Sequence, residues 1–276
     1  MSHVERYIDC PFKYFSARVL RLDEERDDDS GLSPQERGQL LHAVFETFFA
    51  RWQEQGGGTI TAESLDAALE LFEVVAESAL EHLPDADRAL ERNYLLGSAA
   101  SAGLGERAFN FEIEQETPVL ERLLEHKLEG TFDFPTAEGV RRVTVRGKAD
   151  RIDLLEDGTL RVIDYKLGRA PKTARSLQLP VYSACAEQSL NAGKGRRGRQ
   201  WTVSSAGYVA FKEKNAFVPF GGSTPLPQAL ADGAARFVAA IDGIERGEFP
   251  VKPEEPFFCT RCGYAGVCRK DYIGDE

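Results

Sequence analysis

The sequence lacks any continuous apolar segment of about eighteen residues, the shortest length typical of a membrane-spanning helix. Its first residues, Met1–Arg6, contain no apolar core of the kind found in secretory signal peptides. Internal repeats and long low-complexity tracts are also absent. These absences predict a soluble, cytoplasmic protein with no membrane partner. Its 276 residues, 42% of them hydrophobic, can bury a substantial core in one domain or two.

Basic residues are fewer than acidic ones, and the net charge of −11 would argue against a nucleic-acid partner if the charges were evenly spread. They are not evenly spread. Acidic residues gather at Asp23–Asp29 and along Glu63–Glu129, whereas basic residues gather at Arg141–Arg151, Lys166–Arg175 and Lys194–Arg199. A local basic face can bind a phosphate backbone despite an acidic total. A solvated loop explains the last basic group equally well.

Helical patterns dominate the first 129 residues. Ser33 followed by Pro34 and Glu36 has the form of a capping box, which predicts a helix from there to the glycines at 56–58. An apolar stripe at helical spacing supports this helix: Leu41, Val44, Phe45, Phe48, Phe49 and Trp52. We expect a second helix from Thr61 to Pro84 and a third helical stretch over Leu95–Leu128.

The periodicity then changes. Residues 130–167 have strand character, residues 172–192 are helical, Ser204–Phe211 is another strand and Gln228–Gly247 a last helix. Pro180 either kinks the helix at 172–192 or marks its true start. This order of elements predicts a mixed α/β fold with a central sheet.

Two of the expected strands form a hairpin, Val145–Asp153 and Leu160–Lys166, because Asp157 and Gly158 between them are a typical turn pair. Side chains alternate between the two faces of a strand. The hairpin can therefore bring charged side chains of both strands together on one face.

Asp164 and Lys166 must point the same way, while Ile163 and Tyr165 point into apolar packing. The hairpin can place Asp150 near Asp164. Carboxylates bind a hard cation through oxygen, the cation activates water and neutralises phosphate charge, and a lysine stabilises the developing negative charge. The pattern therefore predicts a magnesium-dependent phosphodiesterase.

Three of the five cysteines lie close together, as Cys259-x2-Cys262-x5-Cys268, and Cys10 lies at the other end of the chain. Clustered cysteines in a cytoplasmic protein favour a metal over disulfides. Zinc and a [4Fe–4S] cluster both fit this spacing, and either would join the two ends of the chain as a staple. Cys185 lies on the apolar side of its helix and is expected to be a core residue.

Several motifs occur in the order found in one nuclease family: Cys10-Pro11-Phe12, Gly38-x3-His42-x3-Glu46, Gly147-x2-Asp150-Arg151-Ile152-Asp153, Asp164-Tyr165-Lys166 and Gln178-x3-Tyr182. The chain resembles the RecB-like nuclease family of the PD-(D/E)XK superfamily over nearly its whole length. Its form is similar to the C-terminal nuclease domain of AddB. That domain has one cysteine before the nuclease core and Cys-x2-Cys-x5-Cys after it, which together hold a [4Fe–4S] cluster.

The resemblance implies a restriction-endonuclease-like fold, in which helices flank a central mixed sheet and an iron–sulfur staple joins the termini. Residues 1–276 would form a single nuclease domain. Its parts would be an N-terminal helical lobe at 1–129, a nuclease core at 130–220, and a C-terminal helix with the cysteines at 221–276.

The resemblance also implies roles for single residues. Asp150 and Asp164 would be carboxylate ligands of Mg²⁺ or Mn²⁺, with His42 as a further ligand from the first long helix. Lys166 would be the catalytic lysine. Glu125 is similar to an acidic residue that the family places before the hairpin. Taken alone, His42 would more often be a packed histidine, because it lies on the flank of an apolar stripe beside Phe45 and Phe49.

Two further residues, Gln178 and Tyr182, lie four positions apart on one helix face and in the family flank the active site. They would contact DNA or support Lys166. Asp153, which shares a strand with Asp150, is expected to support the hairpin through Arg151 or a backbone amide rather than to bind metal.

The implied activity is that of a metal-dependent DNA exonuclease acting on single-stranded ends, within a helicase–nuclease repair system or as a stand-alone relative. The sequence contains no P-loop and no helicase motif, so we expect no ATP-driven unwinding by this chain. A helicase subunit or domain would be its partner.

Other functional classes remain open at this point. One is a catalytically silent DNA-binding module stapled by iron–sulfur or zinc, against which the intact Asp-Tyr-Lys and His42 argue. Another is a zinc-stapled protein-interaction domain, which would be colourless, whereas an iron–sulfur protein is brown. A CRISPR-associated RecB-like exonuclease shares the cysteine arrangement, but the long helical stretch before residue 129 fits the AddB form better.

Overall fold

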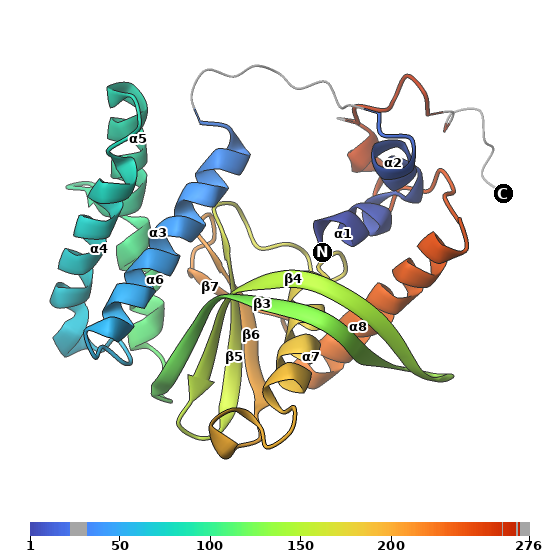
Figure 1. Ribbon diagram of the computed structural model, residues 1–276. Coiled ribbons are helices and arrows are strands. Elements are labelled where there is room, and N and C mark those ends of the chain that lie inside the picture. The colour runs from blue at the N-terminus through green and yellow to red at the C-terminus, as the bar shows by residue number, and fades with distance from the viewer. Residues whose placement is uncertain (23–31, 261, 269, 271–276) are drawn as a thin grey trace.

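The computed structural model describes residues 1–22, 32–260, 262–268 and 270, and its centre is a five-stranded mixed sheet (Figure 1). The strands lie in chain order: β3 (Val119–Thr136), β4 (Gly139–Leu155), β5 (Thr159–Lys166), β6 (Thr202–Ala210) and β7 (Phe217–Pro219). β5 and β6 are parallel and the other neighbours are antiparallel. The expected central mixed sheet is therefore present.

Helices cover both faces of the sheet (Figure 1). One face packs against a lobe made of α3 (Pro34–Glu54), α4 (Leu65–Leu80), α5 (Asp85–Leu96) and α6 (Leu104–Ile113), and the other against α7 (Gln178–Leu190) and α8 (Leu226–Glu245). The strand alternation explains this division. Ile163 and Tyr165 join the core beneath α3, whereas Leu160 and Val162 join the core beneath α7.

The helix α3 begins as the sequence predicts. Ser33 Oγ accepts the backbone N–H of Glu36 at 3.2 Å, and a carboxylate oxygen of Glu36 accepts the N–H of Ser33 at 2.8 Å. This capping box satisfies amides that the first turn leaves without partners. All six residues of the expected apolar stripe are buried. Their burial turns the flank that carries His42 toward the sheet edge.

The prediction of a third helical stretch over Leu95–Leu128 is wrong in part. Gly97, with φ +83°, ends α5 at Leu96, and β1 (Gly97–Ser98) pairs with β2 (Ser101–Ala102) before α6 begins. β3 then starts at Val119, inside the region expected to be helical. Its leucines have helical spacing, but pairing with β4 along most of the strand supplies backbone hydrogen bonds and overrides that local preference.

The hairpin between β4 and β5 forms where the sequence predicts it. Asp157 Oδ1 accepts the backbone N–H of Thr159 at 2.9 Å, and Gly158 adopts φ +85°, which glycine accommodates at little cost. α7 begins at Gln178, so Pro180 lies in its first turn. The missing N–H of Pro180 costs little there, because first-turn amides have no partner within the helix.

The two ends of the chain lie side by side. α1 (Ser2–Asp9) and α2 (Pro11–Tyr14) continue into a π-helical turn (Phe15–Val19), and they pack against the segment after α8. The Tyr7 hydroxyl donates to the carbonyl oxygen of Glu248 at 2.7 Å, and the backbone N–H of Glu254 donates to Asp9 at 2.9 Å. The acidic group Asp23–Asp29 lies outside the described residues.

Within the described part of the chain, no helix is both long and apolar enough to cross a membrane.

Candidate active site

Asp164 and Lys166 project from the same face at the end of β5. Lys166 Nζ lies 2.6 Å from Asp164 Oδ2 and donates to Gln178 Oε1 at 3.1 Å. Between them, Tyr165 points to the opposite face, where its ring stacks on Phe45 at 4.6 Å between centroids. The alternation that the sequence predicts thus separates a polar from an apolar side of the strand.

The hairpin brings Asp150 of β4 to the same place. Asp150 Oδ2 accepts the backbone N–H of Tyr165 at 2.9 Å. Burial and the nearby charge of Asp150 raise the pKa of Asp164 to about 7. Without a cation this carboxyl group therefore holds a proton at a pH where an exposed aspartate has lost it.

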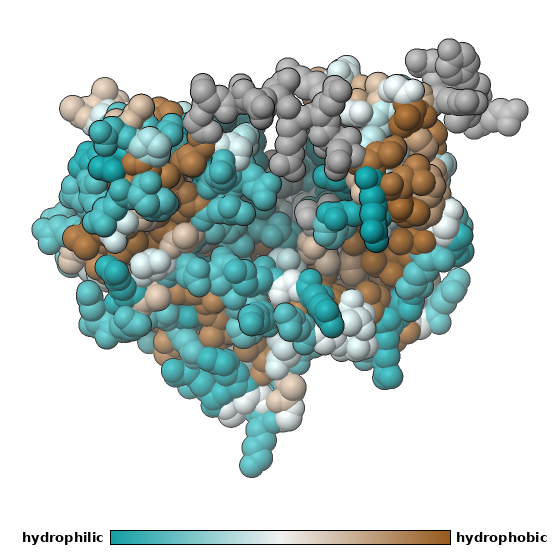
Figure 2. Space-filling model, turned by 45° about the horizontal axis from the view of Figure 1, so that its top comes forward, coloured by the Kyte–Doolittle hydropathy of each residue, from teal (hydrophilic) through white to brown (hydrophobic). Residues whose placement is uncertain are grey.

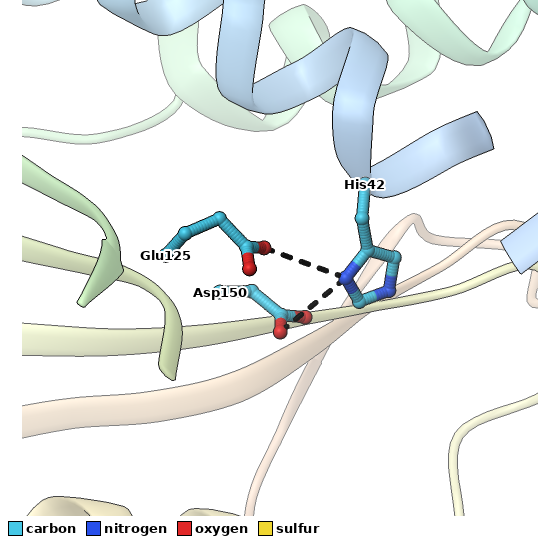
Figure 3. A group of neighbouring side chains, drawn as sticks. All are labelled: His42, Glu125 and Asp150. Atoms are coloured by element: carbon cyan, nitrogen blue, oxygen red, sulfur yellow. Dashed lines mark ion pairs between the residues drawn. The ribbon is translucent and has the colours of Figure 1, made fainter. Parts of the chain in front are cut away.

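A third group approaches from α3. His42 Nδ1 lies 3.4 Å from Asp150 Oδ1 and 3.7 Å from Glu125 Oε1, and the three side chains point toward one another (Figure 3). Each offers one ligand atom within 4.8 Å of the other two, and in the described part of the chain they are the one such group of three or more metal-ligating side chains. Burial lowers the pKa of His42, but Asp150, Asp164 and Glu125 outweigh it and raise the pKa overall.

Glu125 reaches the site through an unusual backbone conformation. It lies inside β3 with φ +44°, a left-handed region that residues other than glycine avoid. The residues on either side pair with β4, whereas Glu125 has no partner in that register. Its carboxylate forms an ion pair with Lys148, a neighbour that the sequence does not single out. Strained residues of this kind concentrate at functional sites.

The two residues expected on one face of α7 lie at the site but have different environments. Gln178 accepts a hydrogen bond from Lys166, as described above. Tyr182 is buried against β4, and a Cβ atom at Gly147 would lie 2.8 Å from Cε1 of its ring. Gly147 therefore allows Tyr182 to approach β4. Burial raises the pKa of Tyr182 to about 12.

A buried ionic network lies beneath β4 and β5, on the face that packs against the helical lobe: Glu112, Arg122, Arg151, Asp153 and Arg161. Arg151 Nε donates to Asp153 Oδ1 at 2.6 Å, which confirms the support expected from Asp153. Arg151 also pairs with Glu112 of α6 at 2.7 Å. Burial alone would raise the pKa of Asp153, but Arg151 and Arg161 lower it to about 2.

The sequence shows only part of this network. Asp153 is two positions from Arg151 on one strand, so their pairing can be foreseen. Glu112 and Arg122 join through folding of distant segments. Arg151 also donates to the Tyr165 hydroxyl at 3.2 Å. The network thus joins α6 to both strands of the catalytic hairpin.

Four of the five cysteines, Cys10, Cys259, Cys262 and Cys268, line one cavity of about 300 Å³ at the joined chain ends. As placed, no three of their sulfur atoms lie within 4.8 Å of one another. Cys185 is fully buried in the core beneath α7, as expected. Burial raises its pKa to about 12, so it remains a thiol.

The family model of the PD-(D/E)XK nuclease superfamily matches residues 1–269. The chain belongs to this superfamily. The five-stranded mixed sheet with helices on both faces is consistent with a PD-(D/E)XK fold, and nucleases of this superfamily use divalent metals.

Curated relatives of this PD-(D/E)XK protein include a subunit of the ATP-dependent helicase/deoxyribonuclease of Symbiobacterium thermophilum, which is 28% identical over 92% of the chain. The match spans 20% of that relative's length. The Gene 69 protein of Mycobacterium phage D29 is 24% identical, over 97% of this chain and 95% of the phage protein.

Among solved structures, the protein described as the crystal structure of SSO0001 is similar, with a TM-score of 0.31 and 13% identity over 94% of both chains. A TM-score this low adds no argument about the fold.

Proposed function

We propose that this PD-(D/E)XK protein is a metal-dependent DNA exonuclease. The observation that carries the proposal is the convergence of Asp150, Asp164 and Lys166 on β4 and β5, beside His42 of α3 and Gln178 of α7. These groups can hold a cation and a scissile phosphate side by side. The relatives named as components of a helicase/deoxyribonuclease support DNA as the substrate and a helicase as the partner.

The residues present fit a hard divalent cation. Asp164 Oδ1 is buried and has no hydrogen-bond partner among the described residues, whereas Oδ2 is engaged by Lys166. Asp150, Asp164, His42 and Glu125 would hold Mg²⁺ or Mn²⁺, because three carboxylates suit these metals. A cation bound there supplies an activated water and neutralises charge on the phosphate.

The side chains of the protein would do the rest. Lys166 is held between Asp164 and Gln178 with its ammonium group partly exposed, so it can stabilise the negative charge that develops on the phosphate. Asp164 and Gln178 each take one N–H of the ammonium group, which leaves its third proton for substrate. Lys148 forms an ion pair with Glu125 and keeps 54% of its side chain exposed, and it would contact the phosphate backbone.

A cavity of about 490 Å³ lies beside these groups, lined by His42, Glu125, Lys148 and the first turns of α3. Hydrophilic residues cover the middle of this face, between the helical lobe and the chain ends (Figure 2). We propose that a single-stranded DNA end enters here and passes the β4–β5 hairpin.

The basic group Lys194–Arg199 is a weaker candidate for contact with DNA. Arg197 Nε donates to Glu121 at 3.0 Å, and Arg196 bonds the same carboxylate. Glu121 therefore neutralises part of this group, and the solvated-loop interpretation of the sequence pattern gains support.

We propose further that Cys10, Cys259, Cys262 and Cys268 hold a [4Fe–4S] cluster. Four thiolates around a single zinc ion stand about 3.8 Å apart, from Zn–S bonds of about 2.3 Å in a tetrahedron. No three of these sulfur atoms lie within 4.8 Å of one another, so the shared cavity supports a common metal group, and the choice of [4Fe–4S] over zinc rests on the resemblance of the cysteine spacing. The cluster would staple the chain ends together over the nuclease core.

The test is a cleavage assay on end-labelled single-stranded DNA, double-stranded DNA and RNA, with Mg²⁺, with Mn²⁺ and with a chelator. We expect single nucleotides or short products from single-stranded DNA ends, and complete loss of cleavage with the chelator. The Asp164→Asn variant serves as the matched control. Cleavage that survives both the chelator and Asp164→Asn would contradict the proposal.

A further inference from the structure

The N-terminus of α7 is capped by a residue from the N-terminal helix of the chain. Glu5 Oε1, on α1, accepts the backbone N–H of Leu177 at 2.9 Å and that of Gln178 at 3.2 Å. First-turn amides have no partner within their own helix. A carboxylate is well suited to this position, because the N-terminus of a helix carries partial positive charge.

The two residues that precede α7, Ser176 and Leu177, do not supply this cap with their side chains. Ser176 would be a suitable capping residue, but its hydroxyl bonds the hydroxyl of Tyr208 in the core. The helix has no side-chain cap from Leu177, which is fully buried. A buried amide without a partner is costly, so the carboxylate of Glu5 decides how the start of α7 sits.

The start of α7 carries the residue that holds the catalytic lysine. The backbone N–H of Gln178 donates a hydrogen bond to Glu5. Its side-chain oxygen Oε1 accepts a hydrogen bond from Lys166 Nζ at 3.1 Å. Gln178 is therefore held by Glu5 of α1 through its backbone and in turn holds Lys166 through its side chain. A displacement of α7 at this point moves Gln178 Oε1 away from Lys166.

The helix α1, which carries Glu5, also contacts the segment that lines the cysteine cavity. Asp9 lies one turn after Glu5, on the same face of α1, and accepts Arg175 Nε at 2.7 Å. Arg175 lies 4.1 Å from the ring centroid of Phe258, next to Cys259. Cys10 follows α1 directly and lines the cavity. α1 thus joins the cavity at one end to the start of α7 at the other.

We propose that Glu5 is a positioning residue for Lys166, and that α1 couples the stapled chain ends to the catalytic centre. This inference rests on the proposed nuclease function. It assigns the N-terminal helix a part in catalysis without contact with DNA or metal.

The experiment compares the full chain carrying Glu5→Ala, Glu5→Gln or Glu5→Asp, with Glu70→Ala on the exposed face of α4 as control. Cleavage kinetics use a single-stranded oligonucleotide with Mg²⁺. Hydrogen exchange is measured in parallel on the peptide that contains Leu177 and Gln178. The exchange readout does not depend on activity.

We expect Glu5→Ala to lower kcat by about tenfold to a hundredfold while KM for DNA stays within about twofold, because a small misplacement of a catalytic group costs rate rather than binding. Glu5→Gln should recover most of the loss, since its amide oxygen can accept the same bonds. Glu5→Asp, which is one methylene shorter, should not recover it. Exchange at Leu177 and Gln178 should quicken in step with the loss of kcat.

The link to the cysteines is tested by combining variants. If α1 transmits the effect, Cys10→Ser lowers kcat in the wild-type background but adds little to Glu5→Ala, because the two changes act on one route. Wild-type kcat in Glu5→Ala, or a loss in Glu5→Gln equal to that in Glu5→Ala, would overturn the inference. Should the wild-type chain fail to cleave DNA, the proposed function fails, and unchanged exchange in Glu5→Ala would separately refute the cap.

Discussion

His42 Nδ1 and Asp150 Oδ1 approach to 3.4 Å, although one residue belongs to α3 and the other to strand β4 of the sheet. α3 packs on one face of the sheet, and α7, which contributes Gln178, packs on the other. The candidate site therefore receives side chains from helices on both faces of the sheet. Each layer supplies one side of it.

Removing the catalytic lysine should abolish cleavage without unfolding the protein. We expect Lys166→Ala or Asp164→Asn to lower the cleavage rate by about 10²-fold or more, the scale seen when one group that stabilises the transition state is lost. Asp164→Asn should not destabilise the fold, because burial already disfavours the charged carboxylate. Cleavage rates and melting curves measure both effects. A Lys166→Ala protein that digests DNA at the wild-type rate would refute the assignment.

His42→Ala should weaken the use of metal more than the binding of DNA, since the imidazole faces Asp150 and Glu125 rather than open solvent. The Mg²⁺ concentration for half-maximal activity should rise. His82→Ala, at an exposed position after α4, is the control and should leave the curve unchanged. An unchanged curve and an unchanged maximal rate in His42→Ala would identify His42 as a packing residue only.

Metal binding should depend on pH near neutrality. The pKa of Asp164 is raised to about 7, so the metal-free site holds a proton below that pH and loses it above. A cation binds the deprotonated carboxylate, so its affinity should rise as the pH increases through 7, and binding should release a proton. Calorimetry in two buffers of different ionisation heat measures this release. Equal affinities for Mg²⁺ at pH 6 and pH 8 would contradict it.

The four-cysteine site should stabilise the fold and affect cleavage only indirectly, through the position of α1. Cys10→Ser should lose the bound cluster and lower the melting temperature, because cluster binding closes a very long loop and adds its free energy to that of folding. DNA binding should fall as well. Cys185→Ser should keep its metal. Metal analysis and thermal melts of the two variants decide the point, and the reverse result would show that the fourth ligand is wrongly assigned.

Loss of either acidic residue of the buried ionic network, Glu112 or Asp153, should lower the free energy of unfolding. Asp153→Asn leaves Arg151 and Arg161 without their shared carboxylate, and a broken buried pair costs about 3–5 kcal/mol in the free energy of unfolding. The folded-state pKa of Asp153, lowered to about 2, lies below its unfolded value of about 3.9. Its contribution is therefore complete above about pH 4 and lost as the pH falls toward 2. Acid titration of stability should show a smaller drop over this range in Asp153→Asn than in wild type.

Much of the site follows from local pattern. The alternation along Asp164, Tyr165 and Lys166 determines which side chains share a face, because a strand has a period of two. The capping box at Ser33 and the stripe from Leu41 to Trp52 determine where α3 begins and which side is buried. These features depend on neighbours within a few residues, so the sequence alone was enough to predict them.

Other features depend on distant segments. The leucines of Leu95–Leu128 favour a helix locally, yet β3 forms because pairing with β4 satisfies a whole strand of backbone groups at once. The positive φ of Glu125, its ion pair with Lys148 and the inclusion of Glu112 in the ionic network result from the same long-range packing. No spacing in the sequence reveals them.

By itself, then, the sequence determined the residue types of the site, their strand and helix faces, and the pattern of cysteines at both ends. Only the tertiary structure decided that α3 and α7 both contribute side chains to the site on β4 and β5, that four cysteines share a cavity, and that Glu5 of the N-terminal helix caps α7. The physical reason is that local preferences act over a few residues, whereas these contacts exist only once both helix layers and both chain ends have packed together.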